Sequence, residues 1–224
     1  MTPGDWTVVV PVKPFSQGKS RLAPDVAVHK SALARCFYLD TLHAVLSTAA
    51  VSRVIVVTGD ADAAALASAR QATVVPDDAA GLNQAVAQGF ATARSLDADC
   101  AVAVVTADLP CLKTVEFSQV LSASHDHRRA FLADHTRCGT TVLTAGRGQD
   151  LRPAFEGRSR WCHLGQGTVE LHLRGVPSAR LDVDTVQDLR AAAALGVGPC
   201  TARLLEGISG WRPAQAVSRG GAGG

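Results

Sequence analysis

The chain has 224 residues, a length typical of one globular domain with a sizeable core. Hydrophobic residues make up 47% of it and charged residues 19%, which disfavours disordered, collagen-like and coiled-coil proteins. The chain has 22 Lys and Arg and 20 Asp and Glu, so its formal net charge is only +2. This charge gives no reason to expect a nucleic acid or a membrane as partner.

In the first half of the chain, predicted strands alternate with predicted helices. Apolar, β-branched runs predict strands at 6–12, 53–58, 72–76 and 100–106. Apolar residues at helical spacing predict helices at 29–47, 61–69, 82–95 and 114–124. This alternation is typical of an α/β fold, in which helices cover both faces of a mostly parallel sheet.

The second half of the chain has a different rhythm. Short strands are predicted at 130–133, 140–143, 169–173 and 180–183, around a loop-rich stretch at 146–167. A last helix is predicted at 185–195, with Gly196 as its cap. We expect these elements to complete one domain over residues 1–212, followed by a disordered tail at 213–224 that is too poor in apolar residues to pack.

The cysteines and histidines give no sign of a metal or redox centre. The six cysteines contain no Cys-x-x-Cys pair, and the seven histidines lack paired metal spacing. We interpret most of the cysteines as small buried hydrophobic residues. The first residues lack the layout of a signal peptide and no apolar run reaches the about 20 residues that span a bilayer, so we expect a cytoplasmic protein. The sequence does not decide between a monomer and a homodimer.

The loop after the first predicted strand carries Lys13, Lys19 and Arg21 beside Gly18. In an open α/β sheet this loop lies at the carboxyl end of a strand, where phosphates are usually bound. A P-loop is excluded, because Lys13 occupies the position where that motif needs its first glycine. The loop is therefore either a phosphate-binding segment or a solvated basic loop.

Three aspartates are candidate metal ligands. Asp108 directly follows a buried predicted strand, where it either caps the next turn or binds a metal. Asp182 and Asp184 are two residues apart in a predicted strand, so their side chains should share one face about 6 to 7 Å apart. Together with Asp108 they form an oxygen-rich set suited to Mg²⁺, although the pair can also be an exposed strand end.

Two loops are weaker candidates for ligand contacts. Asp77, Gly81 and Asn83 lie between a short strand and a helix, where they suit either nucleoside recognition or a helix entry turn. The segment from Phe155 to Ser159 lies in the loop-rich half, and a serine hydroxyl with nearby backbone amides can hold a small carboxylate.

Taken together, these blocks resemble one family. They are PVK…GKSRL at 11–22, DDxxGLNxA at 77–85, TADLP at 106–110, FxxxSxxxH at 155–163 and DVDT at 182–185. In this order they are similar to the CofC/FbiD guanylyltransferases of deazaflavin coenzyme F-420 biosynthesis, which act on 2-phospho-L-lactate or phosphoenolpyruvate. The resemblance covers about residues 6–205 and implies a single Rossmann-like nucleotidyltransferase domain that uses GTP and Mg²⁺.

The resemblance also implies roles for particular residues. It implies that Asp108, Asp182 and Asp184 hold the metal ions. It implies that the acceptor's carboxylate is held by the strand start at Thr140 and Thr141, by the backbone near Glu156 and by Ser159. Lys13, Lys19 and Arg21 would face the GTP phosphates, and Lys19 would act in catalysis on the departing pyrophosphate. One departure is visible, since Glu156 stands where the family commonly has glycine.

The expected reaction is attack by a phosphate oxygen of the acceptor on the α-phosphorus of GTP, with release of pyrophosphate. That oxygen is already largely deprotonated at neutral pH, so no general base is expected. Bacterial members of the family are associated with phosphoenolpyruvate, and the Ala- and Arg-rich composition is common in bacteria of high GC content, so phosphoenolpyruvate is the expected acceptor. The alternatives are 2-phospho-L-lactate, another phosphorylated acid or sugar, and a sensor that binds GTP without turning it over.

Overall fold

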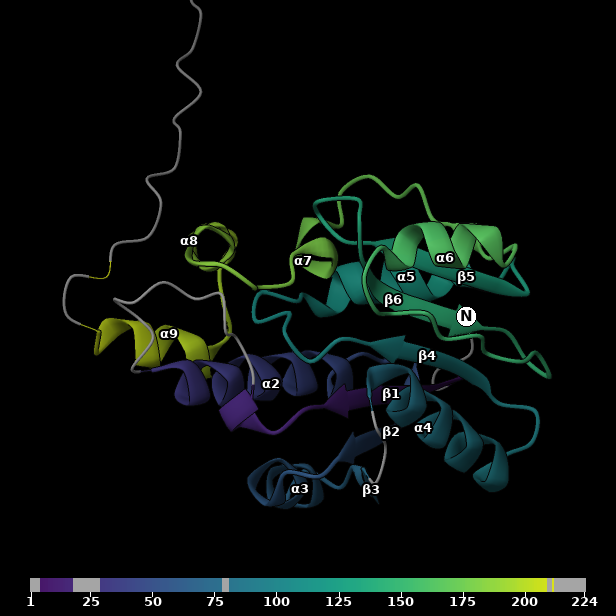
Figure 1. Cartoon of the computed structure of the whole chain (residues 1–224), viewed down its shortest axis with the longest axis horizontal. Helices are drawn as coiled ribbons and strands as arrows, with labels where there is room; N and C mark the ends of the chain where they lie inside the picture. Colours follow the sequence, from purple (N-terminus) through teal and green to yellow (C-terminus); the bar gives the residue numbers. More distant parts are fainter. Residues whose placement is uncertain (1–4, 18–28, 78–80, 209–210, 212–224) are drawn as a thin grey trace, which may run out of the picture.

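The structure is a computed structural model that describes residues 5–17, 29–77, 81–208 and 211. Its centre is a seven-stranded sheet with the order β3-β2-β1-β4-β6-β5-β7 (Figure 1). The strands are β1 Trp6–Val12, β2 Val51–Thr58, β3 Thr73–Pro76, β4 Ala101–Val105, β5 Arg129–Ala133, β6 Thr140–Ala145 and β7 Val169–Glu170.

Helices surround this sheet, as expected for an α/β fold. They are the 3-10 turn η1 Phe15–Gln17 and the helices α2 Lys30–Leu46, α3 Ala61–Ser68, α4 Leu82–Leu96, α5 Thr114–Ser124, α6 Ser159–Gly165, α7 Pro177–Arg180, α8 Val186–Leu195 and α9 Pro199–Glu206. The described elements form one α/β domain with a mostly parallel sheet, which confirms the predicted fold class.

Strand β1 lies at the middle of the sheet and pairs in parallel with both β2 and β4. On the other side of β4, strand β6 runs antiparallel to both β4 and β5. Strands β5 and β7 pair in parallel again, so β6 is the one reversed strand of the sheet formed by the described residues. Thr140 and Thr141 therefore begin β6 at the edge of the sheet where β1 and β4 end.

The two faces of the sheet carry separate layers of core. Val8 and Val10 belong to a cluster that includes residues of α2, α3 and α5, whereas Val9 packs with residues of α4. All seven residues of β1 are buried, which explains its unbroken apolar sequence. On the α4 side a glycine is required, because a Cβ at Gly89 would lie 2.8 Å from the Cγ2 atom of Val57.

A third core layer joins α2 to the C-terminal helices α8 and α9. Leu33 and Phe37 of α2 pack against Leu189 of α8 and Leu205 of α9. Figure 1 shows α9 beside α2, although more than 150 residues separate their sequences. Two further links fasten α9 to α2.

The first link is a disulfide between Cys36 and Cys200, whose Cα atoms lie 5.1 Å apart. The second is the buried carboxylate of Asp40, which accepts hydrogen bonds from the backbone amides of Cys200 (3.0 Å) and Thr201 (2.8 Å). Asp40 thereby satisfies amides at the start of α9 that have no partner within that helix.

Several predicted elements need correction. The strand predicted at 180–183 is absent, because α7 occupies 177–180 and residues 181–184 form no regular element. The strand predicted at 169–173 shortens to β7, and the loop-rich stretch contains α6. Helix α9 was not predicted, because its eight residues carry only one short apolar face. Gly196 does end α8, with a φ of 92°.

The interpretation of the cysteines was right only in part. Cys100 and Cys111 are buried, but Cys138 and Cys162 are exposed and Cys36 is paired with Cys200. The two cysteines are 164 residues apart in the sequence, so no local pattern indicated that they form a pair. The tail at 213–224 lies outside the described residues. Among the described helices, none has the length and apolar character needed to cross a bilayer.

Candidate active site

A cleft of about 900 Å³ opens at the carboxyl ends of β1 and β4. Val12 and Lys13 line it at the end of β1, and Thr106 to Asp108 line it at the end of β4. A smaller pocket of about 340 Å³ adjoins the cleft, because Pro11, Val12, Lys13, Gln17 and Leu82 line both. Ligands of open α/β sheets bind at this edge, since the loops that follow parallel strands converge there.

The three predicted metal ligands all line this cleft. Asp108 follows β4, while Asp182 and Asp184 follow α7. The two segments are joined by a hydrogen bond from the backbone amide of Val183 to the backbone carbonyl of Asp108, 3.0 Å long. This bond, rather than the strand predicted at 180–183, brings Asp182 and Asp184 to the same cleft as Asp108.

The electrostatics of Asp182 are those of a carboxylate crowded by other carboxylates. Burial, and after it the nearby charges of Asp108, Asp134 and Asp184, together raise its pKa from the ordinary 3.8 to about 8. Its ionised form is therefore unfavourable in the protein alone and would be favoured by a cation in the cleft. No group of three or more His, Cys, Asp or Glu side chains within the described ranges has its ligating atoms gathered as a metal site.

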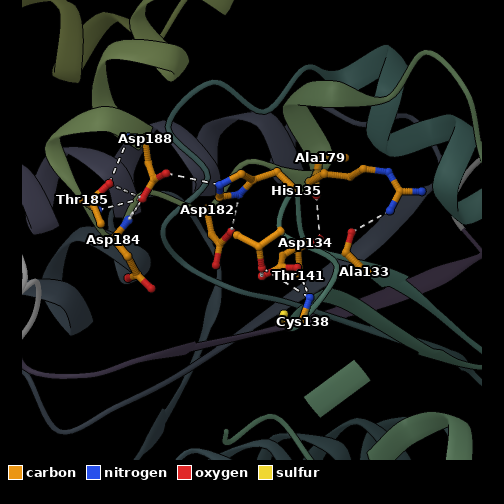
Figure 2. A network of polar contacts seen from close by, with 12 residues as sticks. Ala133, Asp134, His135, Cys138, Thr141, Ala179, Asp182, Asp184, Thr185 and Asp188 are labelled. Atoms are coloured by element: carbon orange, nitrogen blue, oxygen red, sulfur yellow. Dashed lines mark hydrogen bonds and ion pairs between the residues drawn. The ribbon is translucent and has the colours of Figure 1, made fainter. Parts of the chain in front are cut away.

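Asp134 and His135 also line the cleft and were missed in the sequence. Figure 2 shows His135 between two carboxylates: its Nδ1 lies 3.4 Å from Oδ1 of Asp182, and its Nε2 lies 3.2 Å from Oδ1 of Asp188. Asp188 is also held by the N-terminal capping box of α8, where its Oδ2 accepts a hydrogen bond from the amide of Thr185. His135 thereby connects Asp182 to the start of α8.

Asp134 shapes the turn that leads into β6. Its carboxylate accepts hydrogen bonds from the hydroxyl of Thr136 (2.8 Å) and the amide of Cys138 (2.9 Å). The signal that could have found Asp134 was the one used for Asp108, a carboxylate directly after a buried strand, here β5.

The predicted acceptor residues separate into two groups. Thr140 and Ser159 line the cleft, and both side chains are almost fully buried. The hydroxyl of Ser159 has no hydrogen-bond partner among the described residues. Thr141 instead points to α7, where its hydroxyl donates to the carbonyl of Ala179 (2.7 Å), as Figure 2 shows. Its side chain therefore fastens β6 to α7 and does not face the cleft.

Of the predicted nucleotide residues that the structure describes, all but Asn83 line the smaller pocket. Lys13, Asp77 and Gly81 line it. Asn83 does not, because its Oδ1 accepts a hydrogen bond from the amide of Phe155 (2.7 Å) and so fastens the 155–159 loop to α4. The remaining members of the basic loop, Gly18, Lys19 and Arg21, lie outside the described residues.

Glu156 lies where the two pockets meet. It lines the larger cleft, and its Oε1 is 3.2 Å from the position that a Cβ on Gly81 would occupy. Gly81 has a φ of +136°, a conformation open mainly to glycine. The carboxylate of Glu156 thus lies beside Gly81, which lines the smaller pocket.

Solved structures of nucleotidyltransferases share this fold. A putative nucleotide-diphospho-sugar transferase from Desulfovibrio desulfuricans superposes with a TM-score of 0.69 at 18% identity, covering 91% of this chain and 95% of the other. A nucleotidyl transferase from Methanothermobacter thermautotroptrophicus gives a TM-score of 0.61 at 20% identity, covering 85% and 97%.

The chain belongs to the guanylyltransferase family described as "Guanylyl transferase CofC like", whose sequence profile matches residues 6–208. A phosphoenolpyruvate guanylyltransferase of Streptomyces avermitilis is 49% identical over 199 residues, which are 88% of this chain and 92% of the relative. One of Thermomonospora curvata is 44% identical over 216 residues, covering 96% and 95%. The family expected from the sequence motifs is thereby confirmed.

Proposed function

We propose that this protein is a phosphoenolpyruvate guanylyltransferase, which joins GMP from GTP to phosphoenolpyruvate in deazaflavin coenzyme F-420 biosynthesis. The products would be enolpyruvyl-diphospho-guanosine and pyrophosphate. The names of its near relatives support this acceptor. The observation that carries the proposal is that Asp108, Asp182 and Asp184 line the same cleft as the buried hydroxyls of Thr140 and Ser159.

The hydroxyls suit the carboxylate of the acceptor. A carboxylate only accepts hydrogen bonds, and the side chains of Thr140 and Ser159 both carry a hydrogen to donate. Both groups are withdrawn from bulk water, so each bond to an ionised partner is stronger than it would be at the surface. Such donors distinguish a phosphorylated acid from a sugar phosphate, which lacks the carboxylate.

The aspartates suit Mg²⁺, which prefers a few carboxylates completed by water and phosphate oxygens. We propose that Asp108, Asp182 and Asp184 hold it. The fit rests on the crowding of Asp182 by neighbouring carboxylates, whose mutual repulsion a divalent cation would relieve. When bound, Mg²⁺ would neutralise the charges of the two phosphorylated substrates.

In the proposed reaction, a phosphate oxygen of the acid forms a bond to the α-phosphorus of GTP while the bond to the pyrophosphate oxygen breaks. Lys13, which lines both pockets, would face the GTP phosphates together with Lys19 and Arg21 of the same loop. These cations would stabilise the negative charge of the departing pyrophosphate. No proton has to be removed from the attacking oxygen, because it is already largely deprotonated at neutral pH.

The test is release of pyrophosphate from GTP and Mg²⁺ in the presence of phosphoenolpyruvate, 2-phospho-L-lactate, 3-phosphoglycerate or glucose 1-phosphate. We expect turnover with the first acid and a product mass equal to GMP joined to it. A rigid pocket can separate the planar enol from the tetrahedral lactate by about 10- to 200-fold in kcat/KM. A preference for 2-phospho-L-lactate would overturn the acceptor, and GTP binding without pyrophosphate release would overturn the reaction.

A further inference from the structure

His163 is a buried group for which the proposed reaction has no direct use. Its side chain is fully buried on α6. The rings of Phe131 and Phe155 pack against it with centroid distances of 5.4 and 5.5 Å, which fixes the plane of the imidazole. Burial lowers its pKa from 6.5 to about 4, so the ring is neutral at neutral pH.

The hydrogen bonds of His163 determine which ring nitrogen carries the proton. The backbone amide of Ala154 donates to Nε2 over 3.1 Å, and an amide can only donate, so Nε2 has no proton. A neutral imidazole has one N–H group, which must then be at Nδ1. Nδ1 lies 3.0 Å from the hydroxyl oxygen of Thr140 and donates its hydrogen to that oxygen.

This bond fixes the role of the Thr140 hydroxyl. Because the oxygen accepts from His163, it cannot donate its own hydrogen back to the same nitrogen. Within the part of the chain that the structure describes, no protein acceptor takes that hydrogen, and Thr140 lines the cleft. The hydroxyl is therefore set as a donor to a ligand that accepts hydrogen bonds.

We propose that His163 is a positioning residue for the acceptor: its Nδ1–H group orients the Thr140 hydroxyl as a hydrogen-bond donor to the acceptor's carboxylate. This inference rests on the proposed function. The same ring holds the loop at Ala154 through Nε2, and it lies one helical turn after Ser159 on α6. One buried side chain thus connects three segments of the acceptor site, which start at Thr140, Ala154 and Ser159.

Two substitutions each keep one of the two hydrogen bonds of the ring and so separate their effects. In His163→Asn, the amide nitrogen can occupy the place of Nδ1 and keep a donor for Thr140. In His163→Gln, the amide oxygen can reach the place of Nε2 and keep an acceptor for Ala154, but the donor to Thr140 is lost. Both variants remove the imidazole, so thermal stability measured beside the kinetics shows whether the two are comparably folded.

We expect His163→Gln to raise the KM for phosphoenolpyruvate about tenfold or more, which is the usual scale for a lost buried hydrogen bond. The KM for GTP should stay within about twofold, and His163→Asn should restore most of the acceptor KM. Thr140→Val should raise the acceptor KM by a similar factor, with little further increase in the double variant. Thr144→Val, which alters another buried hydroxyl of β6 that does not line the cleft, is the matched control.

An equal rise in both KM values, or equal effects of Asn and Gln, would overturn the inference and leave a purely structural role for His163. So would ¹⁵N spectra of the wild-type ring that place the proton on Nε2. These outcomes are separate from failure of the proposed function, in which the wild-type protein itself releases no pyrophosphate from GTP and phosphoenolpyruvate.

Discussion

Asp182 is a side chain whose ionised form destabilises the metal-free protein and yet suits a bound cation. Its carboxylate is crowded by Asp108, Asp134 and Asp184, and it contacts His135 on the side of α8. Groups with such strongly shifted pKa values are concentrated at functional sites, because function and not stability requires their arrangement. At the scale of the residue, the site is therefore visible as an unfavourable charge distribution.

This arrangement predicts a pH dependence of stability without metal. Between the ordinary pKa of 3.8 and about 8, the folded protein binds a proton at Asp182 that the unfolded chain has released. The free energy of unfolding should therefore fall as pH rises through this window. Asp182→Asn should make the metal-free protein less sensitive to pH and should lower turnover at least about 100-fold.

Thermal unfolding in EDTA at several pH values measures the first effect. Added Mg²⁺ should raise the melting temperature of the wild-type protein more than that of the variant, because a cation favours the ionised carboxylate. Asp126→Asn removes an exposed carboxylate that does not line the cleft, and it serves as the control. Identical responses of Asp182→Asn and the wild-type protein to pH and Mg²⁺ would contradict the metal assignment.

His163 predicts the opposite dependence on pH. Because burial lowers its pKa from 6.5 to about 4, the unfolded chain takes up a proton in this range that the folded protein does not. The stabilisation is complete above pH 6.5 and is lost as pH falls towards 4, by about 2 kcal/mol at pH 5. Between pH 7.5 and pH 5, urea unfolding should show a smaller loss in the free energy of unfolding for His163→Asn than for the wild-type protein. Equal losses in the two proteins would contradict the lowered pKa of His163.

At the scale of elements, close packing places the loops of the site. Helix α4 lies against β1 and β2 at Gly89, where a side chain would meet Val9 and Val57. The same helix holds Asn83 near its start, and Asn83 binds the loop at Phe155. The position of α4 on the sheet therefore determines where the 155–159 loop meets the cleft.

Gly89→Ala should lower the free energy of unfolding by about 1–3 kcal/mol, because the added methyl overpacks the α4 face of the sheet. Alanine's better helix propensity, worth up to about 1 kcal/mol, offsets only part of this cost. Gly165→Ala is the matched control, since a Cβ there has no atom within 4 Å. Denaturant titrations of both variants test this, and equal stabilities would mean that the contact relaxes freely.

At the scale of the whole molecule, the C-terminal part of the chain returns to α2, the first long helix of the described residues. Helix α9 packs on α2 and is held there by Asp40 and by the disulfide between Cys36 and Cys200, while α8 contributes Leu189 to the same core cluster. The segment before α8 carries Asp182 and Asp184, so the closure of the chain also places two of the three predicted metal ligands.

Cys200→Ser should therefore lower the free energy of unfolding by about 2–4 kcal/mol, because the disulfide restricts an unfolded chain over 164 residues of separation. A reducing agent should lower the melting temperature of the wild-type protein towards that of the variant and leave the variant unchanged. Cys162→Ser, at an exposed free cysteine, is the control. A wild-type melting temperature that does not respond to reduction would contradict this prediction.

The sequence by itself determined the alternation of elements and the family. Buried strands are continuous apolar runs and amphipathic helices have a regular period, so both are local signals. Asp108 was recognisable for the same reason, since it comes soon after such a strand, β4, which ends at Val105. The motifs likewise needed only their order along the chain.

Tertiary structure alone decided what depends on contacts between distant segments. The strand predicted at 180–183 was wrong because its apolar residues are buried against α2, α8 and α9 and not within the sheet. Three contacts are of this kind: the ion pair of His135 with Asp182, the hydrogen bond of His163 with Thr140, and the Cys36–Cys200 disulfide. The residues that they join lie between 23 and 164 positions apart in the sequence. No local period encodes these pairs, because they exist only once the sheet has brought the loops to one edge.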